Sequence, residues 1–193
     1  MAKRVFIIHG WEGTPEEGWL PWLKQELESR GFIVDVPSMP DTNAPCIESW
    51  VSYLAGRVKK ADKETYFVGH SIGCQAILRY LETLPANTKV GGVVMVAPWV
   101  NLTTEATPDK ESYEIAKPWL KTMIHWGKVL AHTKRFVAIY SDNDPYVPLT
   151  DSEVFEHALG AKIIIEKGKG HFSGGEGVNK LPVVLKELLK MVG

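Results

Sequence analysis

Residues 65–73, which read Thr-Tyr-Phe-Val-Gly-His-Ser-Ile-Gly, carry the strongest structural signal in this chain of 193 residues. The first four are β-branched or aromatic, which is typical of a buried strand. Residues 75–84 then show apolar side chains at helical spacing. Between them lies Gly-x-Ser-x-Gly, whose two glycines allow a very tight turn around Ser71. The sequence therefore predicts a strand, a sharp turn and a helix in direct succession.

Strands and helices alternate along the rest of the chain. Five further apolar runs predict strands at residues 5–8, 32–36, 93–97, 136–140 and 162–165. Helices are predicted over residues 15–30, 47–60, 119–131, 151–159 and 181–192. This alternation indicates right-handed βαβ units. We expect one α/β domain over residues 1–193, with a six-stranded, mostly parallel sheet and helices on both faces.

The first of these helices has a complete start signal. Thr14 is a good N-cap, Pro15 suits the first helical position, and Glu17 completes a capping box. Pro21 should then kink the first turns of that helix.

Composition and charge exclude several classes of partner. The chain has 22 basic and 23 acidic residues, whereas nucleic-acid and anionic-membrane surfaces need concentrated positive charge. Its longest apolar run, residues 93–100, is far shorter than the roughly 20 residues that span a bilayer. The apolar stretch after Lys3 and Arg4 stops at His9, too early for a secretory signal. We expect a soluble, cytoplasmic protein that binds neither nucleic acid nor membrane.

Ser71 is the candidate nucleophile. Chemistry in parallel α/β sheets belongs outside the carboxyl ends of the strands, and this serine follows such an end. The helix that begins after it favours negative charge at its N-terminus. The alternative is a tight turn whose serine only caps the helix. A serine hydroxyl also needs an adjacent base to become a useful nucleophile at neutral pH.

His171 is the candidate base among six histidines. It lies in the Gly-Lys-Gly-His-Phe segment of residues 168–172, directly after the last predicted strand and so at the same edge of the sheet. The alternative is a solvated loop histidine. His70, inside the tight turn, is interpreted as structural.

The base should be oriented by a carboxylate. The strand at residues 136–140 is followed by both Asp142 and Asp144. Aspartate also favours turns for its own reasons, so either acid could be only a turn former, and position does not separate them. The chain order serine, aspartate, histidine is nevertheless that of the α/β-hydrolases.

Acyl transfer also needs hydrogen-bond donors for an oxyanion. One should be the N–H of Ile72, directly after the nucleophile, and the second should come from residues 9–13, where Trp11 is our choice. Trp11, Trp19 and Trp99 lie on or near loops at this edge and could form an aromatic substrate pocket, the alternative being core packing. Residues 101–114 are polar and could form either a plain loop or a partial lid.

Motifs spread over nearly the whole chain resemble those of the small serine hydrolases of the retinoblastoma-binding-protein-nine/YdeN family. The resemblance implies a compact α/β-hydrolase that lacks the two leading antiparallel strands of larger relatives, and it selects Asp144 over Asp142 as the acid. The motifs are His9-Gly10-Trp11, Trp19-Leu20-Pro21-Trp22-Leu23, Met39-Pro40, Gly69-His70-Ser71, Asp144 before Tyr146-Val147-Pro148, and Gly170-His171-Phe172.

One family feature is missing. The vertebrate members are named for a Leu-x-Cys-x-Glu motif that binds pocket proteins, shortly before the third strand. Residues 59–63 here have neither the leucine nor the cysteine, and residues 44–48 have Cys46 and Glu48 without the leucine. We do not expect that binding role.

Together these features predict a serine hydrolase with a Ser71-His171-Asp144 triad and an oxyanion hole at Ile72 and Trp11. We expect no cofactor and no metal: Cys46 and Cys74 cannot form a four-ligand zinc site of their own. The expected partner is a small-molecule ester with a short acyl group, or less readily a thioester or small amide. The alternative is a protein-interaction module with vestigial catalysis on a hydrolase scaffold. The sequence does not determine the oligomeric state.

Overall fold

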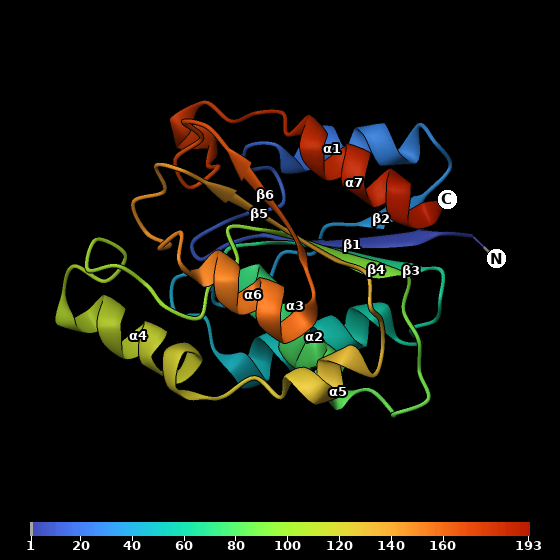
Figure 1. The fold of residues 1–193 in the computed structure, drawn as a ribbon, viewed down its shortest axis with the longest axis horizontal. Helices are drawn as coiled ribbons and strands as arrows, with labels where there is room; N and C mark the ends of the chain where they lie inside the picture. The colour runs from blue at the N-terminus through green and yellow to red at the C-terminus, as the bar shows by residue number, and fades with distance from the viewer. Residues whose placement is uncertain (1) are drawn as a thin grey trace.

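A six-stranded sheet forms the centre of the structure, a computed structural model that describes residues 2–193 (Figure 1). All five strand pairings are parallel, so the predicted α/β sheet is confirmed and is more regular than expected. The strand order is β2-β1-β3-β4-β5-β6. The strands are β1 (Arg4–Ile8), β2 (Ile33–Asp35), β3 (Thr65–His70), β4 (Gly92–Val96), β5 (Phe136–Ser141) and β6 (Lys162–Glu166).

Helices cover both faces of this sheet. In Figure 1, α1 (Leu20–Glu28) and α7 (Pro182–Val192) lie on one face, and α2 (Ile47–Val58), α3 (Ile72–Thr83), α5 (Trp126–Leu130) and α6 (Asp151–Leu159) lie on the other. The strands β3, β4 and β5 are buried along their whole length, as expected for parallel strands covered on both sides. The helix α4 (Lys110–Lys121) lies at the periphery, beside the carboxyl ends of the strands.

The first helix begins later than predicted. It starts at Leu20, and the capping signal at Thr14 is not used. Gly18 has a left-handed φ of 52° and lies so close to the loop at residues 174–178 that an added Cβ would be 3.1 Å from Val178 O. This tertiary contact overrides the local signal. Pro21 therefore falls in the first turn, where its missing N–H breaks no helical hydrogen bond.

The segment after β4 also differs from expectation. Residues 110–121 are helical although they were predicted to begin as a loop, and the helix predicted over 119–131 is interrupted before Trp126. A capping box explains the start of α4, because the Asp109 carboxylate accepts the Ser112 N–H at 2.8 Å. The other end is held by Arg79 of α3, which donates to the carbonyl oxygens of Trp119 and Thr122.

The helix α3 approaches β1 very closely at Gly73. A Cβ at this position would lie 2.6 Å from the carbonyl oxygen of His9 and still closer to that of Ile8. At Gly69 it would lie 2.8 Å from backbone atoms of Cys74. Both glycines of the Gly-x-Ser-x-Gly pattern are thus required by backbone packing.

The same substitution in two helices tests this packing. Gly73→Ala should destabilise the protein by at least about 2 kcal/mol, because the methyl group overlaps backbone that cannot easily move. Gly56→Ala, in an open position of α2, should instead stabilise it by about 0.5–1 kcal/mol. Urea unfolding followed by circular dichroism measures both, and equal stability of the two variants would contradict the packing argument.

Candidate active site

Ser71 lies at the sharp turn between β3 and α3 with φ 53° and ψ −123°, a conformation that is strained for serine. Two hydrogen bonds hold it: the Ser71 N–H donates to Val96 O, and the Cys74 N–H donates to Ser71 O, both at 2.9 Å. The Ser71 side chain lines a cavity. Its hydroxyl has no hydrogen-bond partner among residues 2–193.

His171 and Asp144 are in direct contact. The imidazole Nδ1 lies 2.8 Å from Asp144 Oδ2 and 3.1 Å from Oδ1. The same carboxylate accepts the N–H groups of Tyr146 and Val147, and its side chain is only 3% exposed. An ionised carboxylate can only accept, so Nδ1 carries the proton and Nε2 is left as the basic nitrogen.

Asp142, the other candidate acid, does not hydrogen-bond to the His171 imidazole. Asp142 is exposed, and its Oδ1 accepts the Gly168 N–H at 2.8 Å. It belongs to a row of acceptors that fixes the loop before His171: Ser141 Oγ accepts the Lys169 N–H, and the Asn143 side chain accepts the Gly170 N–H. Four successive residues, 141–144, thus each hold one residue of 168–171.

The backbone of His171 is fixed on both sides. Its N–H donates to Glu176 Oε1 at 2.9 Å, and its carbonyl oxygen accepts from His70 Nε2 at 2.8 Å. Glu176 also completes a capping box with Ser173 at the short 3₁₀ helix η1 (Gly174–Glu176). A side chain at Gly170 would collide with this carboxylate. His171, the candidate base, is therefore oriented by its main chain as well as by Asp144.

His70 is a buried, neutral support for this loop. Burial is the main cause that lowers its pKa to about 3, and the neighbouring His171, whose ring centroid lies 5.1 Å away, acts in the same direction. Its Nε2 must carry the proton, because it donates to a carbonyl. The structural interpretation of His70 made from the sequence fits this geometry.

Trp19 is not part of the cavity wall, so the expectation of a substrate pocket there was wrong. The indole is 1% exposed, and its Nε1–H donates to Phe172 O at 3.1 Å. Its ring packs edge-on against His70. Because α1 starts only at Leu20, Trp19 precedes the helix and packs in the core against the loop that carries His171.

The two expected oxyanion donors lie on neighbouring elements. Ile72 is the first residue of α3, and Trp11 follows β1. Within the described part of the chain, neither N–H has a hydrogen-bond partner. The loop that carries Trp11 is held in place because its indole donates to Asn43 O at 3.1 Å and the Glu12 N–H donates to Thr42 O at 2.9 Å.

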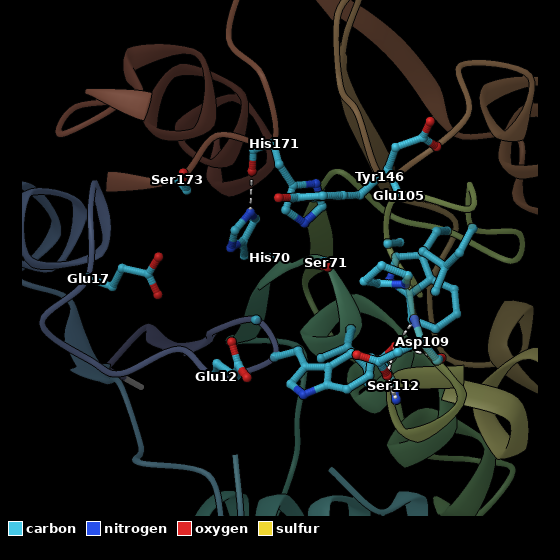
Figure 2. A pocket seen from close by; sticks show the side chains of 17 residues that line it. Glu12, Glu17, His70, Ser71, Glu105, Asp109, Ser112, Tyr146, His171 and Ser173 are labelled. Carbon is cyan, nitrogen blue, oxygen red and sulfur yellow. Dashed lines mark hydrogen bonds between the residues drawn. The ribbon is translucent and has the colours of Figure 1, made fainter. Parts of the chain in front are cut away.

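These groups surround a cavity of about 490 Å³ (Figure 2). Apolar surface comes from Trp11, Leu102 and Tyr146; Trp99 also borders the cavity, but it is only 1% exposed, so its place in a substrate pocket stays a prediction. The other lining residues are Gly10, Glu12, Glu17, His70, Ser71, Ile72, Glu105, Ala106, Pro108, Asp109, Ser112, His171 and Ser173.

Residues 102–112 form one side wall of this cavity. The chain just before this wall is anchored by Asp151, a buried carboxylate at the start of α6 that accepts the N–H groups of Val100 and Asn101 at 2.6 and 2.8 Å. Gln75 of α3 donates to Trp99 O at 3.1 Å. The sequence predicted a loop or a partial lid in this region, but it did not predict that Glu105 and Asp109 line the cavity.

The whole chain was compared with known proteins. Residues 5–190 match the profile of a family described as serine hydrolase. The chain belongs to this serine hydrolase family. It is 30% identical over 184 residues to YdeN of Bacillus subtilis, covering 95% of this chain and 93% of YdeN. It is 26% identical over 190 residues to the serine hydrolase RBBP9 of Rattus norvegicus, covering 97% and 96%.

Solved structures agree. The crystal structure of the B. subtilis ydeN gene product superposes with a TM-score of 0.89 at 29% identity and 99% coverage of both chains. Est1E of Butyrivibrio proteoclasticus, solved with ferulic acid bound, shares the fold with a TM-score of 0.72 at 17% identity, over 99% of this chain and 90% of that one. The resemblance drawn from the motifs and the α/β-hydrolase fold are both confirmed, and the protein is a hydrolase.

None of the helices in residues 2–193 combines the length and the apolar character that a transmembrane span requires.

The low pKa of His70 predicts how stability depends on pH. Unfolded His70 binds a proton near pH 6.5, whereas the folded form does so only near pH 3, so stability should fall as the pH drops through this window. In His70→Gln, which keeps a donor for His171 O, the slope of unfolding free energy against pH should decrease by up to about 1.4 kcal/mol per pH unit near pH 5.

Urea unfolding between pH 5 and 6.5 measures that slope. His157→Gln, the same substitution at an exposed histidine of α6, controls for the loss of an imidazole. An unchanged slope in His70→Gln would show that His70 is protonated in the folded protein.

Proposed function

We propose that this serine hydrolase cleaves small carboxylic esters with a Ser71-His171-Asp144 triad. The observation that carries the proposal is the hydrogen bond between His171 Nδ1 and the buried Asp144 carboxylate beside the strained Ser71, with both Ser71 and His171 lining one cavity. The turn at residues 69–73 would be the nucleophile elbow. In this geometry Ser71 would be the nucleophile, His171 the general base and Asp144 the orienting acid.

Ser71 Oγ would attack the carbonyl carbon of the ester while His171 Nε2 takes the hydroxyl proton. The Asp144 carboxylate would stabilise the imidazolium that forms. The oxyanion would be held by the N–H groups of Ile72 and Trp11. Both are unpaired in the described chain and are available to donate hydrogen bonds to it. Nε2 then gives its proton to the leaving alkoxide, and water releases the acyl group in the same way.

The free structure has no hydrogen bond between Ser71 and His171. Catalytic hydrogen bonds are often long or poorly aligned without substrate and tighten only in the complex. Because the main chain of His171 is held by Glu176 and His70, we expect any adjustment to involve its ring and not the loop.

The size and polarity of the cavity support small or short-acyl esters, and less readily thioesters or small amides. Its volume of about 490 Å³ is modest, and four carboxylates interrupt its apolar wall. The alternative, a protein-interaction module with vestigial catalysis, would be favoured by a loop closed over Ser71, whereas here Ser71 lines an open cavity. No step of the mechanism uses a cofactor or metal, and a cytoplasmic location remains a prediction.

The nucleophile can be tested by covalent labelling. A fluorophosphonate should modify Ser71 alone and stoichiometrically, because only an activated serine attacks phosphorus readily. Peptide mass spectrometry locates the adduct, and urea-unfolded protein is the control that should not react. Ser71→Ala should lose esterase turnover with a nearly unchanged Tm. An adduct elsewhere, or none on folded protein, would refute the assignment.

The acid can be tested by a matched pair of substitutions. Asp144→Asn should lower kcat by several orders of magnitude, about 10⁴-fold by analogy with serine proteases, because the imidazole loses its orienting anion. Asp142→Asn should have a much smaller effect, since the Asp142 carboxylate accepts the Gly168 N–H and not an imidazole N–H. Steady-state kinetics on the folded variants measures both kcat values. A larger loss in Asp142→Asn than in Asp144→Asn would exclude Asp144 as the acid.

Acyl-chain length tests the substrate class. Each methylene must find apolar surface to gain about 0.8 kcal/mol, and the carboxylate-rich wall offers little of it. Across p-nitrophenyl esters we expect kcat/KM to peak between acetate and butyrate and to fall beyond about hexanoate. A value still rising at decanoate would require an apolar groove outside this cavity.

A further inference from the structure

Among the described residues, the acidic side chains that line the cavity have no basic counterparts there. Its lining includes four carboxylates, Glu12, Glu17, Glu105 and Asp109, whereas among the described residues that line it there is no lysine or arginine. The whole chain has 22 basic and 23 acidic residues, so this asymmetry does not follow from composition. A cleft lined by charge of one sign concentrates ligands of the opposite sign.

The four carboxylates come from two opposite parts of the cavity (Figure 2). Glu12 and Glu17 belong to the segment after β1, and Glu105 and Asp109 belong to the segment before α4. Glu17 is partly buried and the other three are exposed, so they lie where a substrate would enter and where water still screens them.

No basic side chain neutralises them. Within residues 2–193 none of the four forms a salt bridge. Glu105 and Asp109 are further stabilised as anions, because hydrogen bonds from backbone N–H groups and from Thr104 and Ser112 lower their pKa values. The site is thus negative at neutral pH.

Aromatic rings give an independent indication. Trp11 and Tyr146 line the same cavity with part of their rings exposed, whereas Trp99 borders it at only 1% exposure and offers almost no ring face. The faces of aromatic rings attract organic cations, and quaternary ammonium groups are bound in proteins by such rings. An anionic substrate would find neither a basic side chain nor a favourable potential here.

A bare metal ion fits less well than an organic cation. Divalent cations need several oxygen ligands within about 2.6 Å. In the described part of the chain, no group of three or more histidine, cysteine or acidic side chains is close enough to hold one. The carboxylates are spread over the cavity, as suits a larger, diffuse charge.

We propose that the ester cleaved by this hydrolase carries a positively charged ammonium group, bound between the two acidic segments and the aromatic rings. The inference rests on the proposed esterase function and adds the charge of its substrate. Bond making and breaking are unchanged: the ester C–O bond is hydrolysed and the ammonium group takes no part. Its attraction acts equally on bound substrate and transition state, so it should lower KM more than it raises kcat.

Two esters of the same shape test the charge alone. Acetylcholine and 3,3-dimethylbutyl acetate differ only in a nitrogen cation replaced by carbon. We expect kcat/KM to be at least about 10-fold higher for acetylcholine, equivalent to about 1.4 kcal/mol. The difference should lie mainly in KM and shrink as NaCl is raised from 0.02 to 0.5 M, because exposed charges are screened.

Variants locate the effect. Glu17→Gln and Glu105→Gln, one from each acidic segment, should each reduce the ratio of the two kcat/KM values, and the double variant should reduce it further. Glu156→Gln removes the same charge from an exposed position of α6 and should leave the ratio unchanged. A ratio near one in the unmodified protein, or an equal loss in Glu156→Gln, would overturn the inference.

A second readout separates this inference from the proposed function. Phosphonates that carry a thiocholine or a 3,3-dimethylbutylthio leaving group should both label Ser71, the cationic one faster. Equal rates at Ser71 would leave the triad standing and overturn the cation preference. Failure of both reagents to label Ser71 would overturn the proposed function and the inference with it.

Discussion

The close approach of α3 to β1 at Gly73 is the constraint on which the site depends. It allows α3 to begin directly after Ser71, so that Ile72 and Trp11 line the same cavity. The cost is a serine in left-handed geometry, which is on the order of 1–3 kcal/mol. The hydrogen bonds of Ser71 with Val96 and Cys74, together with burial of the surrounding strands, offset this strain.

The acid and the base meet because their strands are neighbours. β5 and β6 pair in parallel, with Ser141 opposite Glu166, so residues 141–144 and 167–171 leave the sheet side by side. Contact between Asp144 and His171 is then a consequence of strand order. The hydrogen bonds from residues 141–143 to residues 168–170 only fix which residue of one loop lies opposite which residue of the other. This explains why the sequence alone predicts an acid and a base, 27 positions apart, at one edge of the sheet.

The sequence could predict what depends on strand ends and local motifs, and it failed where distant contacts decide. The turn at Ser71, the loop of His171 and the six strands follow from short apolar runs and glycines. The start of α1 does not, because Gly18 packs against a loop more than 150 residues away. Nor does α4, which is fixed at its C-terminal end by Arg79 of α3. The residues alone also left Asp142 and Asp144 equal, and only the family resemblance separated them.

The negative cavity poses an electrostatic problem that the geometry can resolve. In the proposed mechanism, a tetrahedral intermediate would place negative charge on the oxyanion and positive charge on His171, and the carboxylates of the walls would oppose the first while favouring the second. Coulomb energy falls with distance and with dielectric constant. The stabilisation of an oxyanion by two N–H donors in direct contact would therefore exceed its repulsion by wall carboxylates, which are largely solvent-exposed. The wall charges would therefore act mainly on the approach and placement of substrate, whereas the proposed reaction would be governed by the short contacts around Ser71. This separation would let one chain combine an acidic entrance with chemistry that develops an anion.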